Sequence, residues 1–434
     1  MKAIGTDFRL ILTALALAVA TWFALPAGHA NAAGSCDKVA SPAGSDANAG
    51  TVESPWLSAE YMAEHLAPGE TGCFRAGQFV FDEADITQSN VTLTSYPGER
   101  ATLKGTIKVE VGANQVTVSD LNLNGQGATD IGPFVFANET TFDNVDVTND
   151  HTEICFVIGS ADPSDPPATR TVIENSHIHD CGKLSSGNQD HGIYVSRADE
   201  AIIRDNWIYD NADRGVQLYP ESHGVQVYGN VIDGNGEGVV VSDASSDNVI
   251  QDNVISNSKL RWNVEASNLY GTGNVVRDNC VWASNESQGG YYSENGGIMS
   301  AAESGDGIKV TGNTVADPKF VDAAVDNFTM PDGSGCSAPP GPPAITLQPA
   351  ADQVQVGAPV AVHGVVTGAK LKHVTIQIQR HKRWSKFASA HVKPNGKFKL
   401  RKRLSRRLEM SRVHLRAKMP RVGRSRSVAI RIRG

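Results

Sequence analysis

The sequence predicts an all-β protein, a right-handed parallel β-helix solenoid followed by a small basic β-sandwich. Three observations carry this prediction. A short unit, apolar-x-x-Asn-x-apolar, recurs through the middle of the chain, a second strand signal lies between its copies, and the charge changes sign after a Pro-rich stretch near residue 340. Between residues 113 and 316 the chain is rich in Asn, Asp and Gly and has almost no helical periodicity.

The repeated unit is clearest at 203–208 and 227–232, and the second signal, a Gly followed by alternating apolar residues, at 192–195 and 215–218. The last apolar position of the unit falls at residues 123, 147, 178, 208, 232, 255, 281 and 315, at intervals of 24, 31, 30, 24, 23, 26 and 34. A base interval near 23 with insertions predicts coils of three short strands. Stacked coils bury one continuous core, and the insertions form loops on one side.

One Asn stands at the same place in each unit, at positions 206, 230, 253, 279 and 313. Such a column could bind a ligand, but Asn side chains stacked at one turn also hydrogen-bond to one another and to the backbone. We interpret the column as an internal ladder, because turn positions are the commoner use of Asn. The ladder would stabilise the fold and take no part in chemistry.

Segments outside the repeat complete the pattern. Residues 41–56 have the form of an opening segment, 66–79 of a passage from a helix into the first coil, and 316–334 of a closing segment. In this order they resemble the right-handed parallel β-helix proteins of the pectate-lyase-like superfamily, including its secreted bacterial members. The resemblance implies a solenoid domain over 33–336 with caps at both ends, which would otherwise expose the core and unpaired strand edges.

The N-terminus has the layout of a secretory signal peptide. Lys2 and Arg9 precede an apolar run over 10–25, and Ala30-Asn31-Ala32 supplies a small-x-small cleavage site. The alternative is a membrane anchor, but the run of about 16 residues is shorter than the ~20 needed to cross a bilayer. We expect residues 1–32 to be removed and the protein to be secreted and extracellular, free or associated with the cell surface, without a membrane span.

Six cysteines follow the expected cleavage site. An even number favours disulfides in an exported chain, and no Cys-x-x-Cys pair points to metal ligation. Spacing alone does not select a connectivity. Guided by the repeat, we expect the sequential set, Cys36–Cys73, Cys155–Cys181 and Cys280–Cys336.

The basic part of the chain begins after a Pro-rich linker at 337–343. From residue 341 onward there are 22 Lys and Arg against only Asp352 and Glu409, a net charge of +20, whereas residues 33–340 carry 15 basic and 44 acidic residues, a net charge of −29. Such asymmetry marks a domain boundary.

Residues 344–434 are predicted to form an immunoglobulin-like β-sandwich, because short stretches such as 374–378 and 428–432 alternate with period 2. Its charge implies an anionic partner, and the export signal argues against nucleic acid. We therefore expect an anionic cell-envelope or matrix polymer as the partner of this domain. The alternative is a functionally neutral sandwich that pairs with the acidic solenoid of the same chain.

The candidate catalytic residues lie at the turn that leads into the second strand signal. Asp190 and His191 stand directly before the Gly of one copy, Asp213 and Arg214 before the next, and Glu237 at the equivalent place one coil further on. Equivalent positions of successive coils lie about 4.8 Å apart. His191, Arg214 and Glu237 should therefore form one column. We assign Asp190, His191 and Arg214 as catalytic, with His191 or a neighbour as the base and Arg214 as the group that neutralises substrate charge.

Other side chains could face the same groove and contact the substrate. These substrate-binding candidates are Tyr194, Gln217, Tyr219, His223 and Glu237. His151 and His179 are further candidates on neighbouring turns. The alternative for all of them is that these polar and charged residues are merely part of the solvent-exposed surface at the solenoid turns. Clustering of such residues is only indirect evidence of function.

The resemblance implies action on extracellular polysaccharide. We expect a lyase or epimerase of a uronate-containing glycan and, in second place, a hydrolase with paired carboxylates. The chain departs from the superfamily's known enzymes, since it lacks the polygalacturonase motifs, the Arg-x-Pro-x-x-Arg of pectate lyases and the Asp-Pro-His of alginate epimerases. A shared solenoid does not carry a function with it. The alternative is a non-catalytic glycan-binding or adhesive rod tethered by the basic domain.

The sequence specifies no cofactor. Ca²⁺ could bind the acidic part, for example at Asp162, Asp165 or 210–213, although no spaced oxygen-ligand motif is present. Such an ion would relieve the repulsion between an acidic solenoid and an anionic substrate. A neutral glycan is also compatible with the sequence, which does not specify an oligomeric state.

Overall fold

The computed structural model describes residues 36–433, except for 127–130, 184–189, 284–294, 302–306, 338–343, 346, 352, 368–371, 381–382, 394–395, 405–411, 420–422 and 425–427. The expected signal peptide and nearly all of the expected linker lie outside the described residues. Within the described part of the chain, no helix is long and apolar enough to cross a membrane.

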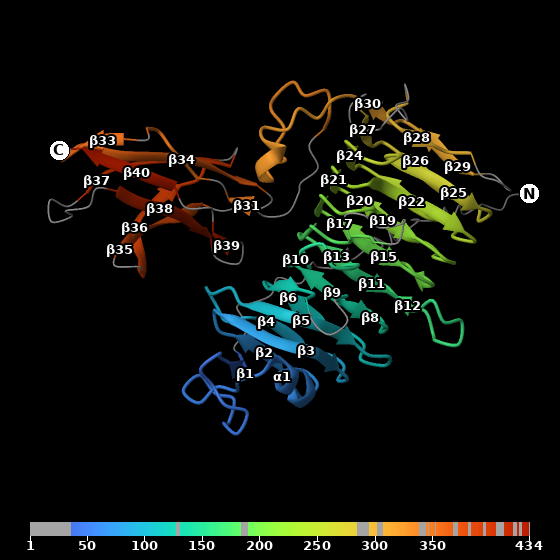
Figure 1. The fold of residues 1–434 in the computed structure, drawn as a ribbon, viewed down its shortest axis with the longest axis horizontal. Coiled ribbons are helices and arrows are strands. Elements are labelled where there is room, and N and C mark those ends of the chain that lie inside the picture. The colour runs from blue at the N-terminus through green and yellow to red at the C-terminus, as the bar shows by residue number, and fades with distance from the viewer. Residues whose placement is uncertain are drawn as a thin grey trace, which may run out of the picture. The chain divides into compact units, whose positions relative to one another are not determined.

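Three parallel sheets run the length of a solenoid, whose coils rise in Figure 1 from β1 and α1 in blue to β30 in orange. The first sheet consists of β1 (Lys38–Ala40), β2 (Thr71–Phe74), β4 (Thr92–Ser95), β6 (Thr117–Ser119), β9 (Thr141–Asp143), β13 (Val172–Glu174), β17 (Ile202–Arg204), β20 (Gln226–Tyr228), β23 (Val249–Gln251), β26 (Asn274–Arg277) and β29 (Ile308–Thr311). Each strand therefore pairs with the strand one coil before it and one coil after it.

The other two sheets share their first strands, β3 (Gln78–Ile86) and β5 (Thr102–Val109), which are long enough to belong to both. The second sheet continues through β7 (Asn122–Asn124), β10 (Asp146–Thr148), β14 (His177–His179), β18 (Trp207–Tyr209), β21 (Val231–Asp233), β24 (Val254–Ser256), β27 (Cys280–Trp282) and β30 (Thr314–Val315). The third continues through β8 (Phe134–Val135), β11 (Phe156–Ile158), β15 (Ile193–Val195), β19 (Arg214–Leu218), β22 (Glu237–Asp243), β25 (Val264–Leu269) and β28 (Ile298–Met299). A short pair, β12 (Ala168–Thr169) and β16 (Ala198–Asp199), stands apart.

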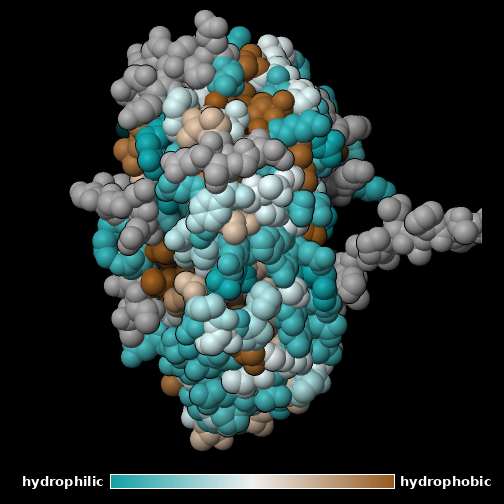
Figure 2. Space-filling view, turned by 90° about the vertical axis from the view of Figure 1, so that its right-hand side faces the viewer, coloured by the Kyte–Doolittle hydropathy of each residue, from teal (hydrophilic) through white to brown (hydrophobic). Residues whose placement is uncertain are grey.

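Alternation along each strand separates the core from the surface. In β17, Ile203 is fully buried while Ile202 and Arg204 on either side are partly exposed. The inward apolar residues of successive coils form one continuous core from the N-terminal helix to Ile308. Hydrophilic residues predominate in the lower half of the surface seen in Figure 2, where hydrophobic ones are scattered. The predicted solenoid is confirmed.

The turn between the first and second sheets explains the repeated unit. At this turn Asp205, Asp252 and Asp278 have φ of 57°, 54° and 57°, and Gly229 and Gly312 have φ of 68°. Asp, Asn and Gly are the residues that tolerate this left-handed conformation. The next residue in each coil is the Asn of the column, so the turn dictates the Asp/Gly-Asn pair.

The Asn column is an internal ladder, as predicted. Asn206 Nδ2 donates to Asn230 Oδ1 at 3.0 Å, and the same bond continues through Asn253, Asn279 and Asn313 at 2.9 Å each. Two further stacks, which the sequence analysis missed, join Asn211 to Asn235 at 2.8 Å and Asn248 to Asn274 at 3.0 Å. Each stack satisfies backbone groups at one corner of the coil.

The helix α1 (Ala59–His65) covers the N-terminal end of the solenoid. Ser58 caps it by accepting a hydrogen bond from the Tyr61 amide at 3.2 Å. Its buried face presents Met62 and Ala63 to the core, and the helix packs against β3. The predicted passage from a helix into the first coil is thus present.

The closing segment packs against the second sheet. Residues 316–337, with the short helix η1 (Ala323–Val325), lie along the outer side of the second sheet, where Phe328 contacts Trp207 and Tyr209 at ring distances of 5.3 and 5.0 Å. Val310 and Val315, which continue core columns in register with the coil below, stay 39% and 44% exposed. These aromatic contacts hold the closing segment against the outer side of the second sheet.

Three disulfides join Cys36–Cys73, Cys155–Cys181 and Cys280–Cys336. This is the expected sequential set. The first ties the opening segment to β2, the second joins the turn before β11 to the turn after β14, and the third fixes the closing segment to β27.

Residues 344–433 form a small β-sandwich, as predicted. One sheet holds β31 (Ala344–Ile345), β34 (Pro359–Thr367), β32 (Gln348–Pro349) and β37 (Lys397–Arg403). The other holds β33 (Gln353–Gln355), β40 (Val428–Arg433), β38 (Arg412–Met419), β35 (His373–Arg380), β36 (Arg383–His391) and β39 (Gly423–Arg424). The two enclose a separate core that includes Val362, Ile376 and Leu415. An immunoglobulin-like topology remains a prediction.

Candidate active site

The predicted column forms at the start of the third sheet. Arg214 and Glu237 are register partners in β19 and β22, and the amide after His191 donates to the Arg214 carbonyl at 2.9 Å. The Asp213 amide in turn donates to the Asp190 carbonyl at 3.1 Å. The parallel ladder therefore brings together the three residues assigned as catalytic and adds Glu237 to them.

All four side chains are buried. Asp190, His191 and Arg214 are 5%, 4% and 8% exposed, and Glu237 is fully covered. Burial, followed by the nearby charge of Arg214, lowers the pKa of His191 to about 3. His191 is thus a neutral imidazole at neutral pH. Removing or neutralising the Arg214 charge would make it more basic.

A second carboxyl completes the cluster. Glu265 lies in β25, in register with Val240 of β22, and its carboxyl neighbours that of Glu237. Burial first, and then the neighbouring Glu265 carboxyl, raise the pKa of Glu237. One proton held between two buried carboxyls is the expected state of such a pair.

Two arginines lie close to the carboxyl pair. Arg261 Nε donates to Glu237 Oε1 at 2.6 Å and lies 4.0 Å from Glu265 Oε2, while Arg214 Nε lies 4.0 Å from Glu237 Oε2. The Arg261 side chain is one-third exposed, whereas both carboxylates are buried. Arg261 therefore stands between the carboxyl pair and solvent.

Buried polar atoms without a hydrogen-bond partner within the described part of the chain gather at this cluster. They are His191 Nδ1, Asp213 Oδ2, Gln217 Oε1, Glu237 Oε2 and Glu265 Oε2. Native proteins satisfy nearly all buried polar groups, so a concentration of unsatisfied ones calls for an explanation. A proton shared between Glu237 and Glu265 would account for the two Glu oxygens.

The remaining predicted residues spread along the third sheet. Tyr194 and Gln217 are register partners, and the Tyr194 ring lies 5.4 Å from that of His191. Tyr219 follows the other end of β19 and is exposed. His223 lies further along the chain, at the turn into the first sheet, where its backbone forms isolated β-bridges with Asp199 and Ser246. Tyr194 and Gln217 thus join the cluster, whereas Tyr219 and His223 do not.

Asp190 adjoins a second charged pair. Burial first, and then the charge of Glu153, raise the pKa of Asp190, while Lys183 pairs with Glu153 and opposes that shift. The pKa of Asp190 therefore lies above that of an ordinary aspartate.

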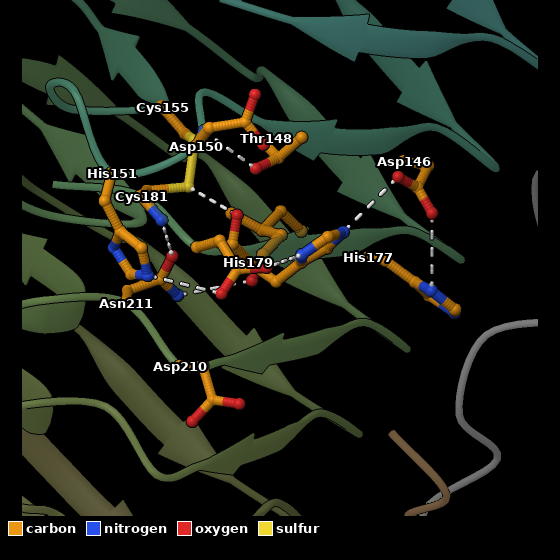
Figure 3. A network of polar contacts seen from close by, with 12 residues as sticks. Asp146, Thr148, Asp150, His151, Cys155, His177, His179, Cys181, Asp210 and Asn211 are labelled. Carbon is orange, nitrogen blue, oxygen red and sulfur yellow. Dashed lines mark hydrogen bonds and ion pairs between the residues drawn. A yellow bond between two sulfur atoms is a disulfide. The ribbon is translucent and has the colours of Figure 1, made fainter. Parts of the chain in front are cut away.

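The histidines on the second sheet belong to a different network (Figure 3). His179 lies between Asp146 at 3.3 Å and Asp180 at 2.8 Å, and Asp146 also faces His177 at 3.7 Å. Burial opposes the charge of His179, but its hydrogen bonds to Asp146 and Asp180 raise its pKa to about 10. Burial lowers the pKa of His177 to about 4.

This network is connected to the candidate site through the backbone. Both imidazoles stack on the next coil, His177 on Trp207 and His179 on Tyr209, each at 5.0 Å. The Cys155–Cys181 disulfide lies beside this network (Figure 3). It is connected to the predicted column, because the Cys155 amide donates to the His191 carbonyl at 3.1 Å. A permanently charged, doubly hydrogen-bonded His179 is a structural element at this corner.

The sequence analysis missed Glu265 and Arg261. Both lie one coil beyond the predicted column, where the Asp-His and Asp-Arg pattern is no longer visible. Glu265 could have been found from the register of the third sheet. Tyr194, Gln217, Val240 and Glu265 occupy equivalent positions in successive coils.

No group of three or more His, Cys, Asp or Glu side chains in the described ranges is arranged to hold a metal ion. The Ca²⁺ positions considered from the sequence include Asp162, whose carboxylate accepts hydrogen bonds from the amide and hydroxyl of Ser164, and Asp210, which pairs with Lys259 at 2.7 Å.

Comparisons with known proteins agree with the fold. Residues 112–315 match the family model described as the right handed beta helix region. No curated protein matches the chain. Among solved structures, the complex of XylC with xylose is 11% identical over 91% of this chain and 100% of that chain, with a TM-score of 0.43.

Two further solved structures are similar at the same level. Pectate lyase Pel9A is 14% identical over 69% of this chain and 88% of that chain, with a TM-score of 0.37. The periplasmic alginate epimerase AlgG is 10% identical over 61% and 84%, with a TM-score of 0.33. The matched segment 112–315 and the three stacked parallel sheets identify the central part of this chain as a right-handed parallel β-helix.

Proposed function

We propose that this protein is an exported enzyme that acts on a uronate-containing polysaccharide by β-elimination or epimerisation. The observation that carries the proposal is the buried cluster at the start of the third sheet, in which a neutral imidazole, two arginines and a proton-sharing carboxyl pair meet. Three disulfides fit an oxidising compartment. In this proposal the basic domain holds an anionic polymer of the cell envelope or matrix.

Arg261 and Arg214 are the groups for the substrate carboxylate. Arg261 is the more exposed of the two and is held by Glu237. An incoming uronate competes with Glu237 for this guanidinium, and planar bidentate pairing favours a carboxylate ligand. Neutralising the uronate charge acidifies the proton on C5, which both reactions must remove.

His191 is the base. Its pKa is low because burial and Arg214 disfavour the imidazolium. A bound uronate compensates the charge of Arg214, so the basicity of His191 rises only when substrate is present. The unpartnered Nδ1 atom is the acceptor for the C5 proton.

Glu237 is the acid. It keeps a proton at neutral pH because its pKa is raised by burial and by Glu265. In β-elimination the C5–H bond breaks toward His191 and its electron pair forms the C4=C5 double bond. The C4–O bond then breaks, and Glu237 gives its proton to the departing oxygen. In epimerisation the C5 proton also goes to His191, and Glu237 instead gives its own proton to C5 from the opposite face, so that the C4–O bond stays intact.

The test is product release by the full chain from polygalacturonate, alginate and neutral xylan, with and without Ca²⁺. Ultraviolet absorbance of unsaturated uronides together with reducing ends identifies a lyase, and a change in the sugar's NMR spectrum without cleavage identifies an epimerase. His191→Gln and Glu237→Gln should each lower the rate by about 10²–10⁴-fold. Arg204→Gln, a matched change on the first sheet, should leave it unchanged.

Two other functions are outcomes of the same test. Reducing ends without unsaturated product would select hydrolysis by paired carboxylates. The deep burial of Asp190, His191 and Arg214 would suit a glycan-binding rod without turnover. Binding without any product across the panel would contradict the enzyme and favour the rod.

A further inference from the structure

The basic sandwich cannot neutralise itself. From residue 341 onward it carries 22 Lys and Arg but only Asp352 and Glu409 as carboxylates. Even if both acids are paired, 20 cations have no counter-charge within the domain. Concentrated charge of one sign raises the free energy of the folded domain and is relieved by a polyanion.

The outer face of the six-stranded sheet concentrates this charge. In β38 the side chains of Val413, Leu415 and Ala417 are fully buried, so Arg412 and Arg416 point outward. Arg412 and Arg431 are direct register partners across β38 and β40, and both are exposed. Side chains of such partners start about 5 Å apart, and like charges in this position are destabilising.

An aromatic ring stands beside these arginines. The Arg416 guanidinium lies 4.1 Å from the centre of the Trp384 ring, and Arg416 Nε donates to Gln377 Oε1 at 2.8 Å. Gln377 is also the register partner of Arg416 across β35 and β38. The strand pairing therefore presents an indole ring, an oriented guanidinium and an amide on one face, next to the Arg412–Arg431 pair.

We infer that this face, defined by Arg412, Arg431, Arg416, Gln377 and Trp384, binds a carboxylate-bearing polysaccharide. The exposed arginine pair receives carboxylates of successive sugar units, and Trp384 with Gln377 contacts the sugar rings. The presence of a ring-stacking group favours a glycan over a polymer of phosphates alone. The inference rests on the proposed function for its choice of uronate, and it adds a second contact of the polymer, separate from the reacting one.

The chain offers a matched control on the opposite sheet. Lys399 and Arg401 point outward from β37 and are exposed, and their register partners are His363 and Ala361. Lys399→Gln with Arg401→Gln removes the same two charges as Arg412→Gln with Arg431→Gln. The two double variants therefore differ only in which face loses its charge.

The experiment measures binding of the full chain to polygalacturonate in the His191→Gln background, so that polymer is not consumed and binding does not depend on turnover. Arg412→Gln/Arg431→Gln should weaken binding about ten-fold, and Lys399→Gln/Arg401→Gln by no more than about two-fold. Trp384→Ala should weaken it further, and added salt should weaken the wild type more than the arginine variant.

Three results would overturn the inference. Equal loss in both double variants would mean that only net charge matters. No loss in either would place the polymer elsewhere. Equal or tighter binding to polyphosphate or DNA, or full binding to the methyl-esterified neutral polymer, would refute the carboxylate partner. Product release that fails while this binding persists would refute the proposed reaction and leave the binding face standing.

Discussion

The interior of the Asn ladder offers a quantitative test of the solenoid. Asn230 is fully buried, and its side chain takes part in five hydrogen bonds. Its Nδ2 donates to Asn253 Oδ1 at 2.9 Å and to the carbonyls of Ile203 at 2.8 Å and Tyr228 at 3.1 Å. Its Oδ1 accepts from the backbone and side chain of Asn206 at 3.0 Å each. Asn230→Ala removes all five and leaves the Asn206 amide without its acceptor.

The expected cost follows from these contacts. At about 1 kcal/mol for each lost bond, Asn230→Ala should lower the free energy of unfolding by about 5 kcal/mol. Asn313 stands at the end of the same ladder, is partly exposed, and donates to the Val276 carbonyl at 3.1 Å. Water can replace its bonds, so Asn313→Ala should cost about 1 kcal/mol.

Guanidinium unfolding of the oxidised protein, followed by far-ultraviolet circular dichroism, gives both values. Asn230→Asp sharpens the test, because a carboxylate keeps the acceptor but cannot donate to Ile203 or Asn253. This variant should be less stable at pH 7 than at pH 4, where protonation restores a donor. An Asn313→Ala cost equal to that of Asn230→Ala would refute the argument that burial sets the value of each ladder bond.

Two further predictions concern the candidate site and the closing segment. Because burial and Glu265 raise the pKa of Glu237 above its ordinary value of 4.5, the folded state keeps a proton that the unfolded state loses, and stability falls as pH rises from about 4.5 to about 8. Glu237→Gln fixes the neutral form and should reduce this loss of stability by about 1.4 kcal/mol for each pKa unit of the shift. The measurement is the difference in unfolding free energy between pH 5 and pH 8. An unchanged difference would contradict the shared proton. Phe328 is 4% exposed against Trp207 and Tyr209, so Phe328→Ala should weaken docking of the closing segment by about 3 kcal/mol and red-shift tryptophan emission, which would stay unchanged if the segment docks through other contacts.

The repeat could be predicted because local backbone geometry imposes it. Each turn between the first and second sheets needs a left-handed residue followed by the ladder Asn, and this requirement returns with every coil. The column of His191, Arg214 and Glu237 was predicted for the same reason, since parallel coils place equivalent residues in register. The three disulfides also followed the order of the coils.

What the sequence could not supply are contacts that depend on side-chain direction across coils. Glu265 reaches Glu237 from a position that is not equivalent to it in the repeat, and Arg261 comes from the connection between β24 and β25. The burial that keeps Glu237 protonated and His191 neutral exists only once the coils are stacked. The sequence by itself determined the solenoid, its ladder and the main column, because these repeat with the chain. The tertiary structure decided the carboxyl pair, the course of the closing segment and the protonation states, because these depend on what each side chain meets in other coils.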